Sequence, residues 1–196
     1  MRYGKFITLF FLLLLVLAGG MFAIVGNSTA ETRSGIDYVN GYRSWTRVTP
    51  ALYRLPAKAL AACAAPMQSA PTEAQIKSGD VDHDEFAYIS VYANPTARHA
   101  MMEEKSPKFP EGSVIVKEKY RADDTLHPTL STVMIKHARG YNTSVGDWEF
   151  MVVDGPAKKV MARGKLDHCQ SCHAGMGNND FISRAYLPAT VEEKMK

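Results

Sequence analysis

Five consecutive residues near the end of the sequence combine two thiols with an imidazole: Cys169, Gln170, Ser171, Cys172 and His173. Two cysteines at this spacing can each add to one vinyl group of the same porphyrin, and the adjacent histidine is then placed beneath the ring, with its imidazole aimed at the iron. We therefore expect one covalently attached haem c, held by Cys169 and Cys172, with His173 as the proximal iron ligand.

The same C-x-x-C spacing also occurs in redox-active dithiols, in half of a zinc site and in structural disulfides. A zinc site is disfavoured because no second C-x-x-C or H-x-x-x-H pair supplies the remaining ligands. A thioredoxin-like dithiol is disfavoured because no βαβ pattern accompanies the motif. The third cysteine, Cys63, lies in an Ala-rich stretch. Two alternatives stay open for it: a small buried core residue, or a thiol that pairs with another molecule.

The first thirty residues have the pattern of an export signal. Arg2 and Lys5 precede the apolar run 6–25, and small residues at 27–30 offer a cleavage site after Ala30. An uncleaved membrane anchor remains open, because about 20 helical residues reach ~30 Å, the thickness of a bilayer core. Either way, residues 31–196 are expected to form a single domain in the periplasm, which touches a membrane only if the signal stays attached.

The composition is that of an ordinary globular protein, with 46% hydrophobic and 22% charged residues over 196 positions. Without Arg2 and Lys5, 21 basic residues face 20 acidic ones, a net charge of +1. The lysines are dispersed among Glu and Asp, so we expect no nucleic-acid partner.

The remaining pattern predicts an α+β domain, mainly an antiparallel β-sheet with a few short helices, followed by the C-terminal CxxCH haem segment. Alternating apolar residues predict strands, and helical spacing or flanking Pro and Gly predict short helices and loops. The expected strands are 86–93, 113–120, 130–138 and 147–153, the expected helices 38–45, 57–65 and 96–104, and the expected loop 68–84.

The position of the motif favours an open sixth coordination site. Only 23 residues follow His173, and the methionines mostly sit in periodic apolar patterns, where Met is usually core filling. Met176 is too close in sequence to reach the opposite haem face easily. An open iron favours binding of small ligands over pure electron transfer, although Met or His as a sixth ligand in a simple electron-transfer protein stays an alternative.

Several segments, in this order and spacing, resemble the cytochrome P-460 family, which includes the β-sheet cytochromes c′ (cytochrome c′-beta). They are Tyr42–Trp45, Val91–Pro95, Phe109–Glu118, Gly146–Phe150, the haem motif, and Asp180–Pro188. In the enzymes that name the family a lysine is joined covalently to a meso carbon of the porphyrin. The resemblance places that lysine at Lys117, whereas the strand pattern alone is typical of a solvated lysine.

The resemblance implies two functions. One is oxidation of hydroxylamine or a similar nitrogen compound, with electrons passed to a partner cytochrome; the other is binding of nitric oxide or carbon monoxide without catalysis. It also implies a homodimer. Whether the protein is an enzyme stays open, because Thr132 stands near the place of a distal acidic residue, which leaves His137 or His127 as candidate proton acceptors. Phe86, Tyr88 and Phe109 are candidate walls of a gas pocket.

Overall fold

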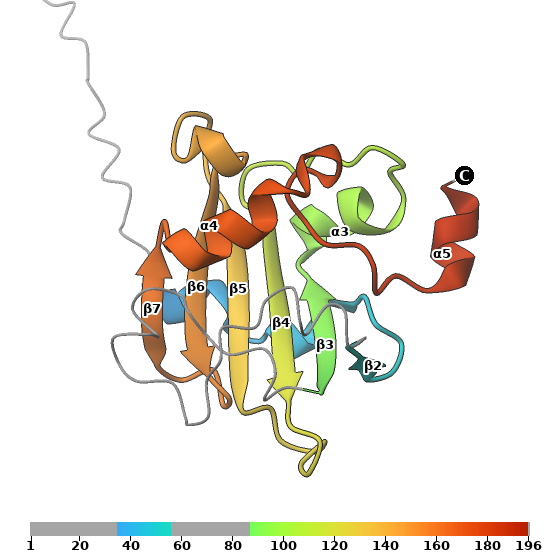
Figure 1. Ribbon diagram of the computed structural model, residues 1–196, viewed down its shortest axis with the longest axis vertical. Coiled ribbons are helices and arrows are strands. Elements are labelled where there is room, and N and C mark those ends of the chain that lie inside the picture. The colour runs from blue at the N-terminus through green and yellow to red at the C-terminus, as the bar shows by residue number, and fades with distance from the viewer. Residues whose placement is uncertain (1–34, 56–86, 196) are drawn as a thin grey trace, which may run out of the picture. The chain divides into compact units, whose positions relative to one another are not determined.

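An antiparallel sheet dominates the part of the chain that the computed structural model describes, residues 35–55 and 87–195 (Figure 1). Within these residues the sheet has seven strands in the order β1-β3-β4-β5-β6-β7, and β2 also pairs with β3. All neighbouring strands run antiparallel. The strands are β1 Thr46–Arg47, β2 Tyr53–Arg54, β3 Tyr88–Ala93, β4 Val114–Tyr120, β5 Leu130–Lys136, β6 Trp148–Asp154 and β7 Val160–Gly164.

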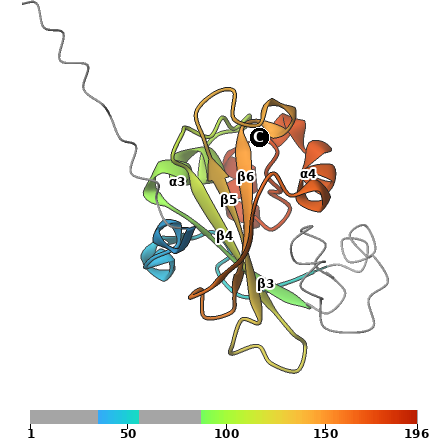
Figure 2. The same cartoon turned by 90° about the vertical axis from the view of Figure 1, so that its left-hand side faces the viewer.

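Short helices surround this sheet. The haem motif lies on α4, which crosses one face of the sheet, whereas the first two 3-10 turns lie on the opposite face (Figure 2). The helical elements are η1 Gly35–Tyr38, η2 Tyr42–Ser44, α3 Pro95–Met102, η3 Thr143–Val145, α4 Asp167–Ala174, η4 Gly177–Asn179 and α5 Ala189–Lys194.

Each face of the sheet packs into its own apolar cluster, because successive side chains of a strand point to opposite faces. On β4, Ile115 belongs to the cluster on the α4 side, which also contains Trp148 and Phe150. Val114 and Val116 belong to the cluster on the side of η1 and η2. A strand buried on both faces is rich in apolar residues throughout, so Lys117, Glu118 and Lys119 in the middle of β4 are its unusual feature.

The structure confirms the α+β class and all four expected strands, which are β3 to β6 with ends shifted by one or two residues. The amphipathic helix expected over 38–45 is wrong: Gly41, at a φ of 70°, separates two short 3-10 turns. The strand β7 was not predicted because its five residues include Arg163 and Gly164 and alternate only weakly. The expected helix 57–65 and loop 68–84 lie outside the described residues.

No helix among the described residues is long and apolar enough to cross a bilayer. The apolar run 6–25, on which the expectation of a signal or anchor rests, lies outside these residues.

Candidate haem site

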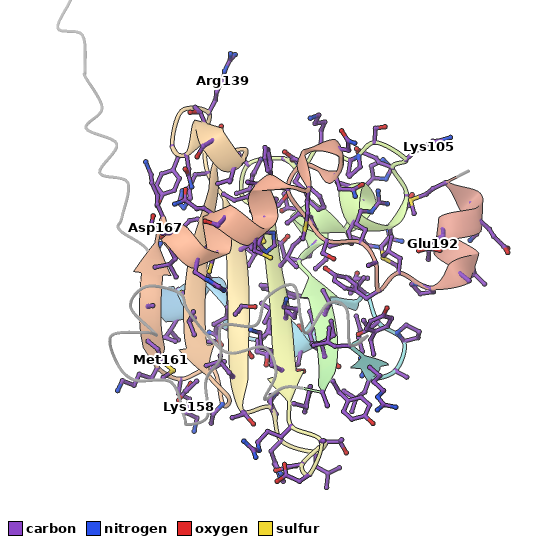
Figure 3. All side chains as sticks on the ribbon, viewed as in Figure 1. Lys105, Arg139, Lys158, Met161, Asp167 and Glu192 are labelled. Atoms are coloured by element: carbon purple, nitrogen blue, oxygen red, sulfur yellow. The ribbon has the colours of Figure 1, made fainter. Side chains whose placement is uncertain are left out.

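Helix α4 brings the three residues of the motif to one face. Cys169, Cys172 and His173 stand at positions i, i+3 and i+4, which adjoin on a helix surface. Asp167, labelled in Figure 3, lies in the first turn, where a negative charge favours the helix dipole. The three residues whose spacing in the sequence suits a porphyrin therefore also share one face of the helix in the fold.

This face of α4 and the sheet enclose a cavity. Its volume is about 170 Å³. The motif residues share the cavity with strand residues and with residues that follow the helix. Its lining consists of Leu55, Ile89, Ile115, Lys117, Lys119, Thr132, Val133, Met134, Phe150, Met151, His168, Cys169, Cys172, His173, Met176, Ile182, Ser183 and Tyr186.

The imidazole of His173 is oriented by one hydrogen bond. Its Nδ1 lies 2.7 Å from the carbonyl oxygen of Phe181, and since a carbonyl only accepts, Nδ1 carries the proton. Burial lowers the pKa of His173 to about 4, despite the hydrogen bond to Phe181. The ring is therefore neutral at physiological pH, and its Nε2 lone pair is available to a metal. The Phe150 ring lies 5.4 Å from the imidazole, centroid to centroid.

The segment after α4 is held to the sheet through Asp180. The Asp180 carboxylate accepts hydrogen bonds from Lys136 Nζ at 2.7 Å and from the backbone N–H of Phe109 at 2.9 Å. The indole N–H of Trp148 donates to the Asp180 carbonyl at 2.8 Å. Asp180 and Phe181 both adopt positive φ, 51° and 65°, which costs a non-glycine residue about 1–2 kcal/mol.

Lysine amines enter the cavity from the sheet. Lys117 and Lys119 lie on the cavity face of β4, and Thr132 on β5 is the residue directly opposite Lys117. Burial raises the pKa of the Cys169 thiol, and the positive charges of Lys119 and Lys117 offset only part of that rise. The structure thus brings Lys117 into one cavity with the whole haem motif, as the resemblance implies.

Other residues singled out in the sequence lie elsewhere. His137 Nε2 donates a hydrogen bond to the Glu149 carboxylate at 2.7 Å, and His127 is exposed beside Asp124; neither histidine lines the cavity. Phe109 packs on Trp148 instead of lining the cavity, and Tyr88 also lies outside its lining. Cys63 and Phe86 lie outside the described residues.

Most of the apolar cavity wall could not be predicted from the sequence. Ile89, Met134 and Phe150 line the cavity from three different strands. Strand alternation could have shown that each shares a face with its neighbours, but not which face α4 covers. Met134 was expected to be core filling; it is buried in the apolar cluster and also lines the cavity.

The chemistry of these groups fits a haem better than a bare metal ion. Among residues 35–55 and 87–195 there is no cluster of three or more His, Cys, Asp or Glu side chains that could hold an ion. One neutral imidazole and two thiols on one helical face, opposite an apolar wall, suit a porphyrin joined to thiols and ligated on one side.

The fold and the site together define a c-type haem protein built on an antiparallel sheet. The chain belongs to the cytochrome P460 family, whose model matches residues 39–183. The family supports a c-type haem cofactor and therefore a cytochrome. None of the curated proteins compared with the chain is a match.

Proposed function

We propose that the protein is a periplasmic cytochrome with one haem c, which binds a small nitrogen compound such as hydroxylamine opposite His173 and oxidises it. The observation that carries this proposal is that Lys117 lines the same cavity as Cys169, Cys172 and His173. When bound, the haem supplies the iron that takes the nitrogen compound as a ligand and accepts its electrons. Each electron then passes to an oxidised partner cytochrome, and each proton to solvent.

The chain's own residues have distinct parts in this proposal. Cys169 and Cys172 attach the haem through thioether bonds, and His173 provides the proximal nitrogen. Lys117 would hold the haem through a bond from its Nζ to a meso carbon. Formation of that bond would remove one hydrogen from each atom and so would need an oxidant of the peroxide class, which is reduced to water.

Mass spectrometry of the haem peptide tests the role of Lys117. We expect one haem joined to the peptide that contains Cys169 and Cys172 and also to the peptide that contains Lys117. The matched control is Lys119, which lies on the same strand face and lines the same cavity. Lys117→Leu should abolish the cross-link, and Lys119→Leu should keep it; a wild-type haem peptide without Lys117 would contradict the proposal.

A hydroxylamine assay tests the reaction itself. Wild-type protein should reduce an oxidised c-type cytochrome when hydroxylamine is added, and Lys117→Leu should lose that activity while it keeps its haem. A wild-type protein that carries the cross-link but transfers no electrons from hydroxylamine would contradict the enzymatic function.

A second function, binding of nitric oxide or carbon monoxide without catalysis, is favoured by the cavity wall. Ile89, Ile115 and Phe150 make it apolar, and none of the described residues that line it is Asp or Glu, so no carboxylate there accepts a proton. The absorption spectrum of the reduced protein separates the two functions. A strongly red-shifted Soret band indicates the modified haem, and an ordinary Soret band with tight nitric oxide binding indicates the gas-binding protein.

The location and assembly form part of the same proposal. The basic start, the apolar run 6–25 and the small residues up to Ala30 support export to the periplasm. Cell fractionation and N-terminal sequencing of the mature protein test this and distinguish cleavage after Ala30 from an uncleaved anchor. Sedimentation of the purified protein tests the homodimer that the family resemblance implies.

A further inference from the structure

We propose that Asp180, held by Lys136, is a positioning residue for the proximal imidazole. It fixes the Phe181 carbonyl at the point where that carbonyl accepts the Nδ1 proton of His173, and so sets how strongly His173 donates to the iron. The inference rests on the proposed ligation of a haem by His173 and goes beyond it, because it concerns how the ligand is tuned.

The first step is the anchoring of Asp180. Its carboxylate is nearly buried, with 7% of the side chain exposed, and Lys136, which bonds it at 2.7 Å, is 12% exposed. The same carboxylate oxygen also accepts the backbone N–H of Phe109. Since the Asp180 carbonyl accepts the Trp148 indole as well, this one residue is tied to β5, to β6 and to the segment before β4.

The second step is the strained backbone that these bonds hold. Asp180 and Phe181 follow each other at positive φ, which non-glycine residues adopt rarely and only where their surroundings impose it. The Phe181 ring packs so closely on Gly146 that a Cβ there would lie 2.6 Å from Phe181 Cδ2. The Phe181 N–H donates to the Met176 carbonyl at 3.0 Å. Release of Asp180 therefore lets residues 180–181 relax and moves the Phe181 carbonyl.

The third step links that carbonyl to the ligand. A hydrogen bond from the non-ligating nitrogen of a histidine fixes the tautomer and the ring plane and raises the basicity of the ligating nitrogen. The bond from His173 Nδ1 to Phe181 is short, at 2.7 Å. A displaced carbonyl weakens it, so the iron–imidazole bond becomes weaker and the ferrous form is favoured.

The experiment uses the full haem-loaded chain with Asp180→Ala, Lys136→Met and Lys136→Arg. Three readouts report on the proximal bond: the iron–histidine stretching frequency of the ferrous protein, the reduction potential, and the ratio of five- to six-coordinate ferrous nitrosyl. Asp180→Ala should lower the frequency, raise the potential and increase that ratio about fivefold, the worth of one typical hydrogen bond. Lys136→Met should change all three in the same direction by less, and Lys136→Arg should stay close to wild type.

A control on the opposite face of the sheet separates positioning from general stability. Glu149 is as buried as Asp180 and is held in the same way, by Arg163 at 2.7 Å and His137 at 2.7 Å, and neither of these partners belongs to the segment that bears Phe181. Glu149→Gln should therefore lower the free energy of unfolding without changing the three haem readouts.

Three outcomes would count against the inference. Asp180→Ala and Lys136→Met proteins with the wild-type frequency and potential would overturn it, and if Asp180→Ala fails to take up haem, Lys136→Met alone decides. Equal changes in Glu149→Gln would also overturn it. A wild-type protein without an iron–histidine mode would refute ligation by His173, whereas a protein with that mode but without hydroxylamine activity refutes only the proposed reaction.

Discussion

Lys117 on β4 and Thr132 on β5 lie directly opposite each other, and both side chains line the cavity that contains Cys169, Cys172 and His173. Opposite residues of an antiparallel pair share a face, with Cβ atoms about 4.5–5.5 Å apart. The family resemblance places a distal acid near Thr132, so a neutral hydroxyl stands there, next to the lysine expected to modify the haem.

Thr132→Glu should raise hydroxylamine oxidation, because it places a carboxylate beside Lys117 in a cavity whose described lining residues include no Asp or Glu. A positioned general base typically contributes about 10²–10⁴-fold, and an unoptimised one should give about tenfold in kcat/KM. The measurement is steady-state reduction of a partner cytochrome, and Thr132→Val is the control, because it has a similar volume and cannot accept a proton. An unchanged kcat/KM in a fully haem-loaded Thr132→Glu protein would show that the proton released from hydroxylamine does not leave at the cavity wall beside Thr132.

Gly146→Ala should destabilise the protein by about 2–5 kcal/mol in urea unfolding. The added Cβ would lie 2.6 Å from the Phe181 ring, and the residue has a φ of 65°. Overpacking costs about 1–3 kcal/mol and the left-handed conformation about 1–2 kcal/mol.

Gly41→Ala isolates the two costs of the Gly146 variant. Gly41 has a φ of 70°, yet a Cβ there meets nothing within 4 Å. Gly41→Ala should therefore destabilise the protein by only the ~1–2 kcal/mol that the left-handed backbone costs a non-glycine residue. Equal losses in both variants would mean that Phe181 moves aside at no cost.

Glu118→Leu should destabilise the protein by about 3 kcal/mol or more, because it removes the buried carboxylate that accepts hydrogen bonds from three donors. Glu118 is fully buried and accepts from Tyr42 Oη at 2.5 Å, Tyr120 Oη at 2.6 Å and Arg43 Nε at 2.8 Å. Chemical denaturation measures the loss. Glu118→Gln keeps an acceptor oxygen and should lose less, so a glutamine variant as unstable as the leucine variant would contradict this account.

Stability should fall in acid through Glu149. Burial by itself would raise the pKa of Glu149, but the hydrogen bonds and charges of Arg163 and His137 hold that pKa below its usual value of 4.5. A carboxyl with a lowered folded pKa stabilises the protein fully above the unfolded pKa and loses that contribution as the pH falls through the folded pKa.

Urea unfolding at a series of pH values checks the acid prediction. The wild-type free energy of unfolding should decline as the pH drops below about 4.5. Glu149→Gln cannot titrate, so it should be less stable at neutral pH and show a shallower decline in acid. Parallel pH curves for the two proteins would assign the acid loss to other carboxyls.

The strands and the haem site could be predicted from the sequence because both depend on the pattern of residues that are neighbours in the chain. Alternation of apolar residues marks β3 to β6 whatever their partners, and it already placed Lys117, Ile115 and Lys119 on one strand face. It failed for 38–45, where the left-handed backbone at Gly41 interrupts a helical pattern.

The sequence by itself predicted the haem chemistry of Cys169, Cys172 and His173, because residues at positions i, i+3 and i+4 share one helical face through local geometry alone. Only the tertiary structure decided that α4 covers the Lys117 face of β4 and that Asp180 anchors the segment after the helix. Asp180 is 44 residues from Lys136 and 71 from Phe109. Contacts over such separations arise from how the sheet and helix pack, which no local pattern of residues encodes.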